Sequence, residues 1–199
     1  MLDLKIRNAQ VYDGMGTPAQ RCDVGVRDGL IVALGDPLLS ASARQTIDAE
    51  GLALMPGIVD NHTHYDAQVT WDPYCTPSPA LGVTTAVIGN CGFTIAPCRP
   101  ADRDRVMRNL TQVEGMSLDV LRSGIDWSFE TIPEYLDLLD RRSSAINLAA
   151  FVGHSSVRTW VMGEAATERA ASPDEIAAMR HLVDEGIAAG AIGFATSTS

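Results

Sequence analysis

The stretch Leu52-Ala-Leu-Met-Pro-Gly-Ile-Val-Asp60-Asn-His62-Thr-His64 decides the fold class of this chain, because an apolar run leads into an Asp-x-His-x-His tip. Alternate residues of a strand point to the same side, so His62 and His64 should project together, with Asp60 on the same side. Imidazole and carboxylate groups suit zinc and similar divalent ions. The pattern predicts a metal-binding strand end, and the alternative is a pair of exposed histidines without a ligand role.

A second apolar segment, Thr84–Gly89, leads into Asn90-Cys91-Gly92. The glycines on both sides of the Asn-Cys pair let the backbone turn sharply and approach a ligand closely. Cys91 follows the C-terminal end of a predicted buried strand, which in α/β barrels is the catalytic face, and a thiolate is a good zinc ligand. The alternative is a small buried cysteine that fills space, which is our interpretation of the other three cysteines, Cys22, Cys75 and Cys98.

Composition limits the class of protein. The chain has 199 residues, 46% of them hydrophobic, and a formal net charge of −10. This acidity argues against a nucleic-acid partner, and no apolar run is long enough to span a bilayer, so we expect no membrane partner. Met1–Lys5 lacks a signal-peptide profile, and four irregularly spaced cysteines do not suggest a disulfide framework. These features predict a cytoplasmic protein.

The pattern of the chain changes near residue 55. Residues 1–54 read as short strands, with Leu2, Leu4 and Ile6 alternating with polar residues and a hairpin signal at Arg27-Asp28-Gly29. Residues 55–199 read as strands that alternate with helices, which predicts a parallel α/β sheet. We therefore expect a small β domain over residues 1–54, followed by part of a barrel over residues 55–199.

The number of predicted elements is about half that of a complete barrel. Four barrel strands and three helices are expected, the last helix starting at a Ser172–Glu175 capping box. A complete (β/α)8 barrel has eight strands and typically ~250 residues, so the chain is expected to be the N-terminal part of a longer enzyme with an unpaired sheet edge. The predicted strands are Leu54–Val59, Thr84–Gly89, Ala145–Val152 and Ala191–Thr196; the helices are Ala101–Glu114, Phe129–Arg142 and the segment from Pro173 to Gly190.

Four motifs carry a family resemblance that covers essentially the whole chain. Met55–His64 resembles the opening barrel strand of the amidohydrolase superfamily. Gly82–Gly92, which ends in Gly-Asn-Cys-Gly, narrows the resemblance to the N-acyl-D-amino-acid deacylases (D-aminoacylases), as do Ile132–Leu136 and Gly153–Arg158. The resemblance implies a β-sandwich portion, completed by a C-terminal segment, followed by the first half of a metal-dependent hydrolase (TIM) barrel.

The resemblance also implies how the site works. The expected metal ligands for Zn²⁺ or another divalent ion are His62, His64 and Cys91. Many two-metal amidohydrolases bridge their ions with a carboxylated lysine, but the one lysine here, Lys5, lies outside the predicted barrel strands, so Cys91 is the candidate for that bridge. The general base and two further histidine ligands are expected on later barrel strands, so no catalytic residue is assigned within this chain.

Two further residues are candidates for orienting the ligands or contacting substrate. Asp60 could hold a histidine tautomer through its other ring nitrogen, or it could cap the strand end. His154 follows the third predicted strand and could face the substrate, or it could be a structural histidine bonded to backbone. Asp66 is interpreted as a solvated loop carboxylate.

The leading functional hypothesis is a metal-dependent hydrolase that cleaves linear amide bonds and deacylates N-acyl-D-amino acids. One alternative is a cyclic amidase that resembles hydantoinases and dihydroorotases, and another is a non-catalytic, truncated metal-binding remnant. The expected partners are a small N-acyl amino acid and either the remaining half of the barrel or a second copy of the chain. Without the later strands, the chain alone is expected to be inactive.

Overall fold

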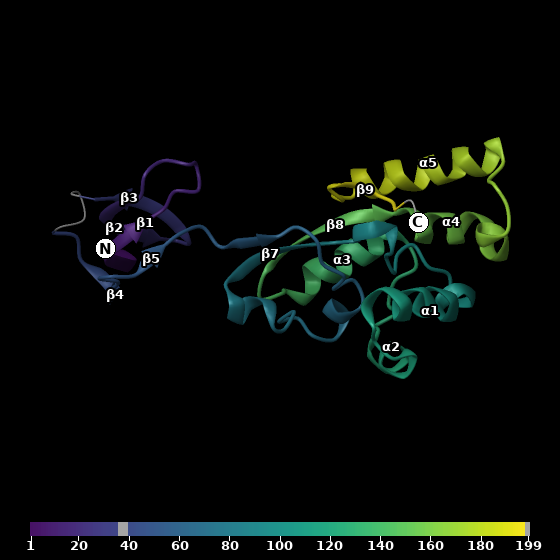
Figure 1. Ribbon diagram of the computed structural model, residues 1–199, viewed down its shortest axis with the longest axis horizontal. Coiled ribbons are helices and arrows are strands. Elements are labelled where there is room, and N and C mark those ends of the chain that lie inside the picture. Colours follow the sequence, from purple (N-terminus) through teal and green to yellow (C-terminus); the bar gives the residue numbers. More distant parts are fainter. Residues whose placement is uncertain (36–39, 198–199) are drawn as a thin grey trace. The chain divides into compact units, whose positions relative to one another are not determined.

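The structure is a computed structural model that describes residues 1–35 and 40–197 (Figure 1). The chain forms two compact units, Met1–Gly57 and Ile58–Ser199. Each unit has its own sheet, and each is described by itself below.

The first unit is built on a mixed five-stranded sheet with the order β3-β2-β1-β4, to which β5 adds by pairing with β1. Strand β2 runs antiparallel to both of its neighbours, β1 and β3, whereas β4 and β5 run parallel to β1. Asp28 and Gly29 have positive φ angles between β2 and β3, which confirms the predicted hairpin. The strands are β1 (Leu2–Val11), β2 (Gln20–Arg27), β3 (Leu30–Leu34), β4 (Ala43–Asp48) and β5 (Ala53–Leu54).

Lys5 lies in β1 of this first unit, where its side chain is buried and its Nζ is 3.5 Å from a carboxylate oxygen of Asp23. An opposite charge at this distance compensates part of the cost of burying the ammonium group. Lys5 is therefore placed outside the parallel sheet, as the sequence predicted.

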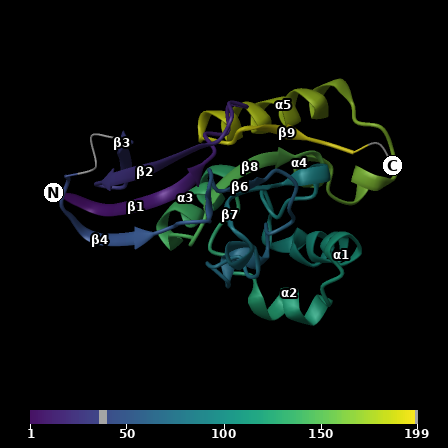
Figure 2. The same ribbon diagram turned by 60° about the vertical axis from the view of Figure 1, so that its left-hand side comes forward.

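The second unit contains a four-stranded sheet with the order β6-β7-β8-β9, in which all neighbours are parallel (Figure 2). Helices follow the strands along the chain, so the predicted α/β class and parallel half-barrel are confirmed. The strands are β6 (Ile58–Asp60), β7 (Val83–Ile88), β8 (Asn147–Gly153) and β9 (Gly193–Ala195).

One predicted barrel strand is wrong in its bounds. The apolar run Leu54–Val59 is divided, because Leu54 ends β5 in the first sheet and only Ile58 and Val59 enter β6. Pro56 lies between the two strands and has no N–H to donate to a ladder, which interrupts the run physically. The other three barrel strands lie where they were predicted, to within two residues at each end.

Five α-helices occur in the described part of the second unit: α1 (Arg103–Glu114), α2 (Leu118–Gly124), α3 (Ile132–Arg142), α4 (His154–Met162) and α5 (Pro173–Ala188). The three predicted helices correspond to α1, α3 and α5, and the Ser172–Glu175 capping box at the start of α5 is confirmed. Helices α2 and α4 were not predicted. Among the helices of the described residues, none has the length and apolarity needed to cross a bilayer.

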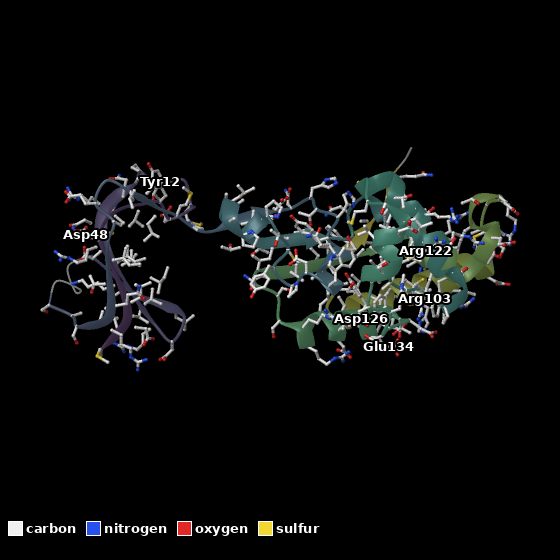
Figure 3. The ribbon with its side chains drawn as sticks, turned by 90° about the horizontal axis from the view of Figure 1, so that it is seen from below. Tyr12, Asp48, Arg103, Arg122, Asp126 and Glu134 are labelled. Carbon is white, nitrogen blue, oxygen red and sulfur yellow. The ribbon has the colours of Figure 1, made fainter. Side chains whose placement is uncertain are left out.

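The helices pack on the sheet through alternate strand residues. Ala86 and Ile88 of β7 belong to one core cluster with residues of α1, α2 and α3, whereas Val152 of β8 joins a second cluster that α5 covers. Charged side chains such as Arg122, Asp126 and Glu134 lie along the helical part of the unit (Figure 3). Burial of alternate apolar residues thus fixes which way each strand faces, and with it the direction of the residues at the strand ends.

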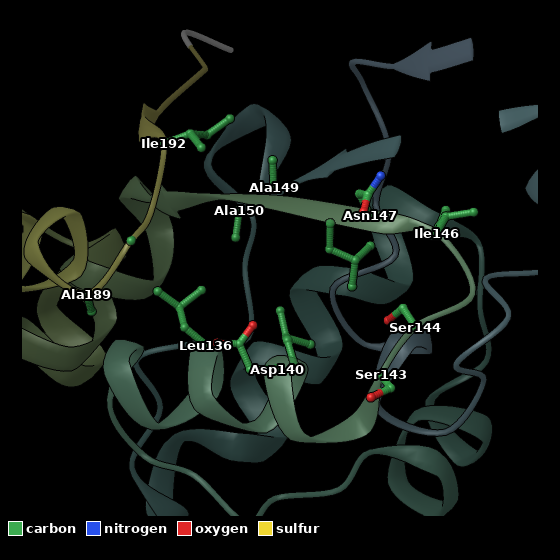
Figure 4. Close-up of a pocket in the computed structure, with 13 residues that line it drawn as sticks. Leu136, Asp140, Ser143, Ser144, Ile146, Asn147, Ala149, Ala150, Ala189 and Ile192 are labelled. Atoms are coloured by element: carbon green, nitrogen blue, oxygen red, sulfur yellow. The ribbon is translucent and has the colours of Figure 1, made fainter. Parts of the chain in front are cut away.

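A cleft of about 450 Å³ lies at the amino ends of the parallel strands (Figure 4). It is formed by the end of α3, the end of α5, the start of β8 and the segment before β9, and its lining includes Ser144, Asn147, Ala149, Ala189 and Ile192. The predicted metal ligands do not line this cleft; they lie beyond the opposite, carboxyl ends of the strands.

Candidate metal centre

The structure brings His62, His64 and Cys91 together. One potential ligand atom from each lies within 4.8 Å of the others, and the Cys91 Sγ is 3.3 Å from the His62 Nε2. The two imidazole rings are 5.5 Å apart between centroids, in an edge-to-face arrangement. Because β6 and β7 are parallel neighbours, the residues that follow them reach the same edge of the sheet.

The chemistry of these three side chains fits a divalent metal such as zinc. Nitrogen from histidine and sulfur from cysteine are the ligands that zinc prefers. The His64 Nδ1 is buried and has no hydrogen-bond partner among the described residues. Burial, and secondarily the nearby His62, lower the pKa of His64, which favours the neutral imidazole that a metal requires.

Backbone strain accompanies the cysteine. Cys91 has a φ of 56°, in the left-handed region that a residue with a Cβ adopts at a cost of about 1 kcal/mol or more. Gly89, just before it, has a φ of 81°, and a Cβ there would lie 2.6 Å from the Phe151 carbonyl oxygen. The turn into Cys91 therefore needs glycine at 89, as the flanking-glycine pattern predicted.

The Cys91 loop is also held from the β8 side. The Ser155 hydroxyl, at the start of α4, donates to the Gly92 carbonyl. Thr94 and Ser156 bond to each other through their hydroxyl groups at 2.8 Å, and the Ser156 hydroxyl also donates to the Thr94 carbonyl. The turn after β8 thus fixes the segment that follows the cysteine.

Asp60 contacts backbone in this structure. Its Oδ1 accepts a hydrogen bond from the His62 N–H at 3.3 Å, which is the geometry of a strand-end cap. Asp60 does not belong to the cluster of three potential ligands found in the described part of the chain. We assign it to shaping the turn that carries His62.

His154 is the first residue of α4 and does not belong to the cluster of three potential ligands found among the described residues. Its Nδ1 is 3.0 Å from the Thr196 Oγ1, and its ring packs edge-on against Phe194 at 5.9 Å. Burial and then the charge of Arg158 lower the pKa of His154. Its contacts link the end of β8 to the segment after β9.

Sequence reasoning missed a buried carboxyl group beside the site. Asp66 was interpreted as a solvated loop residue, but it is 1% exposed, and its Oδ2 accepts from the Gly89 N–H at 3.1 Å. Burial raises the pKa of Asp66 to about 7. The spacing of Asp66, two residues after His64, was the available signal, but spacing alone does not distinguish a buried from a solvated carboxylate.

The two histidines also line an open cleft of about 340 Å³, together with Thr63, Tyr65, Gln68 and Met116. A group held by the three ligand atoms would therefore lie beside a hollow with both apolar and polar walls. A metal ion held by these three side chains would be accessible to a small molecule in the cleft.

The chain belongs to the amidohydrolase family, whose sequence profile matches residues 45–199. It is 41% identical over 194 residues to a D-aminoacylase of Alcaligenes xylosoxydans xylosoxydans, an alignment that covers 98% of this chain and 37% of that protein. The chain thus spans little more than a third of the length of this curated relative.

Two solved structures are similar over nearly the whole chain. A D-aminoacylase, described for its binuclear metal centre, is 37% identical with a TM-score of 0.81, covering 98% of this chain and 38% of that one. The N-acyl-D-glutamate deacylase of Bordetella bronchiseptica, solved with zinc and a phosphonate inhibitor, is 34% identical with a TM-score of 0.81 and the same coverage. These likenesses support the family assignment.

Proposed function

We propose that this chain supplies the first metal-holding part of an N-acyl-D-amino-acid deacylase, an enzyme that hydrolyses the linear amide of its substrate to a carboxylate and a free D-amino acid. The observation that carries the proposal is the convergence of His62, His64 and Cys91 within 4.8 Å at the carboxyl ends of parallel strands. The similarity to D-aminoacylases over 98% of the chain supports the substrate class.

Within this proposal, His62, His64 and Cys91 hold zinc or another divalent ion. The ion would supply Lewis-acid polarisation of the substrate amide. The lowered pKa of His64 favours the neutral ring, which can donate a lone pair to the ion. Cys91 is the proposed bridge if two ions bind, because its sulfur lies beside His62 and the one lysine lies in β1.

The proposal places the rest of the reaction outside these strands. The general base and further ligands come from later barrel strands in the remaining part of the enzyme. Residues 1–54 then contribute to a composite β-sandwich domain, and residues 55–199 form the first half of the barrel.

The four cysteines are free thiols in the structure, which fits a reducing cytoplasm.

A chimera tests this function directly. The 199-residue chain replaces the matching N-terminal part of the Alcaligenes D-aminoacylase, and the purified chimera is assayed with zinc for release of D-methionine from N-acetyl-D-methionine. Cys91→Ala in the same chimera is the control, and hydantoin is offered in parallel as a cyclic substrate. We expect deacylation that the control loses, because the variant lacks a metal ligand while the rest of the barrel is unchanged.

Each other result argues against the proposal. A folded, zinc-loaded chimera without deacylase activity would favour the non-catalytic remnant. Ring opening of hydantoin in place of deacylation would favour a cyclic amidase. Undiminished deacylation in Cys91→Ala would remove the cysteine from the site.

A further inference from the structure

We infer that Asn90 is a positioning residue, whose amide sets the distance between Cys91 and the histidine pair by joining the two segments that carry them. The inference rests on the proposed function of the three ligands as a metal centre. It assigns Asn90 no contact with the ion or the substrate.

The contacts of Asn90 reach both segments. Its Nδ2 donates to the Val87 carbonyl at 2.8 Å and to the Thr63 carbonyl at 3.3 Å. Val87 belongs to the strand that leads to Cys91, whereas Thr63 is the residue between His62 and His64. The Asn90 amide therefore bonds to a residue 27 positions earlier in the sequence and connects the two segments that carry the ligands.

The Val87 carbonyl is the centre of this connection. It also accepts from the Thr63 N–H at 3.1 Å and from the Thr63 hydroxyl at 2.8 Å. Asn90 is 8% exposed and Thr63 is likewise buried, so water cannot readily replace a lost donor. Two carbonyls from different segments need a group with two N–H donors, which is what a side-chain amide provides.

Asn90 also precedes the strained residue directly. Cys91 holds its φ of 56° only if the surrounding structure fixes the turn. The buried side chain of Asn90, the preceding residue, is one of the contacts that fix it. Without the amide, the turn would still be held by Gly89 on Asp66 and by Ser155 on Gly92. We therefore expect the fold to persist while the spacing of the ligands loosens.

Cobalt binding to the 199-residue chain tests the inference. Co²⁺ replaces zinc, and its thiolate charge-transfer band reports whether Cys91 is bound. For Asn90→Ala we expect Co²⁺ affinity to fall about 10- to 100-fold, the usual range for losing a partner that orients a metal ligand, and the band to weaken or shift. A purely structural role would lower thermal stability without changing the band.

Asn147→Ala is the matched control. The Asn147 amide also bonds to β7, donating to the Thr84 carbonyl at 3.2 Å, but it does so at the amino end of that strand. Its Co²⁺ affinity and band should equal those of the wild type. An equal loss in both variants would overturn the inference, because it would show a general loosening of β7.

The remaining outcomes separate this inference from the proposed function. If Cys91→Ala keeps the band, the metal centre itself is wrong. If Cys91→Ala loses the band but Asn90→Ala binds Co²⁺ within about twofold of the wild type, the centre stands and the positioning role is overturned. Should Asn90→Ala fail to fold, Asn90→Ser decides: it keeps a polar side chain but has a single donor, which cannot bond both carbonyls, and unchanged affinity there would also overturn the inference.

Discussion

The two ends of the parallel sheet differ in how polar groups are used. At the carboxyl ends, Asn90, Thr63 and Asp66 are buried and each makes a specific bond to a neighbouring segment. The buried atoms without a partner among the described residues there are the His64 Nδ1 and the Asp66 Oδ1, which belong to a candidate ligand and to the carboxyl group beside it. At the amino ends, the cleft of Figure 4 contains the Ser144 hydroxyl, whose oxygen is buried without a partner among the described residues.

Positive φ angles occur at both ends of the sheet. Gly89, Cys91 and Gly92 have them just past the carboxyl end of β7, and Ser143 and Gly190, which line the amino-end cleft, have them as well. Strain of this kind persists only where surrounding contacts over-determine it, but its presence alone does not distinguish the two ends. The comparison teaches that the larger cleft is not the better candidate site, because the buried polar contacts that join neighbouring segments lie with the ligands at the other end.

The largest expected effect is the loss of metal binding on removing a ligand. His62→Ala and Cys91→Ala should each weaken zinc binding by more than the roughly 100-fold upper range for losing an orienting partner, since a direct bond to the ion is lost. Competition with a chelating dye measures the affinity. Asn147→Ala, at the amino end, should bind zinc like the wild type, and an equal loss there would erase the distinction between the two ends.

The cysteines offer a second way to sharpen the comparison. Cys75 and Cys98 are 0% and 1% exposed, and burial raises the pKa of Cys75 to about 11 and that of Cys98 to about 12. Because the thiolate is the reactive form, raising the pKa of Cys75 from 9.0 to about 11 lowers its thiolate fraction about 100-fold near neutral pH.

In a Cys22→Ser background without metal, we therefore expect iodoacetamide to alkylate Cys91 faster than Cys75 or Cys98, whose burial limits both access and thiolate formation. Zinc should protect Cys91 from the reagent. Peptide mass spectrometry over a time course measures each site. Equal labelling of the three thiols, or no protection by zinc, would contradict the assignment of the half-buried Cys91 as a metal ligand.

Much of this arrangement was predictable because it depends on local pattern. The apolar runs of β7 and β8 fixed those strands, and the rule that parallel strands end at one edge brought His62, His64 and Cys91 together. The pattern could not divide the run Leu54–Val59, since its two halves pair with different sheets. Strand pairing is a long-range contact that a single apolar stretch does not encode.

The missed elements have separate physical reasons. Helix α4 starts directly after β8 at Gly153, which offers no side-chain cap, so no start signal marks it. Helix α2 has such a signal, because Ser117 accepts from the Val120 N–H, but it is short. The burial of Asp66 and Asn90 is set by tertiary packing, which the sequence does not show.

A pair of serines gives a smaller, matched test of the two ends. Ser155→Ala removes the donor to the Gly92 carbonyl beside the ligands, and we expect it to lower the free energy of unfolding by about 1 kcal/mol. Ser144→Ala removes the unpaired hydroxyl in the amino-end cleft and should be neutral or slightly stabilising. Urea denaturation measures both, and a greater loss in Ser144→Ala would mean that the cleft is the more organised end.

The smallest expected effect concerns Glu175, a charged residue of helix α5 that takes no part in the contacts described at either end of the sheet. Glu175 accepts two short bonds from Arg169 and one from the Ser172 N–H, and these lower the pKa of Glu175 to about 2, the Arg169 bond being the main cause. Because the folded-state pKa lies below the unfolded value, the carboxylate stabilises the fold above about pH 4.5, and this contribution is lost as the pH falls toward 2.

Glu175→Gln should therefore lower the thermal midpoint slightly at pH 7, and the difference from the wild type should shrink below about pH 4. Its zinc affinity should be that of the wild type. A difference that grew on acidification would reverse the sign of this assignment, and weaker zinc binding would show that α5 reaches the ligands.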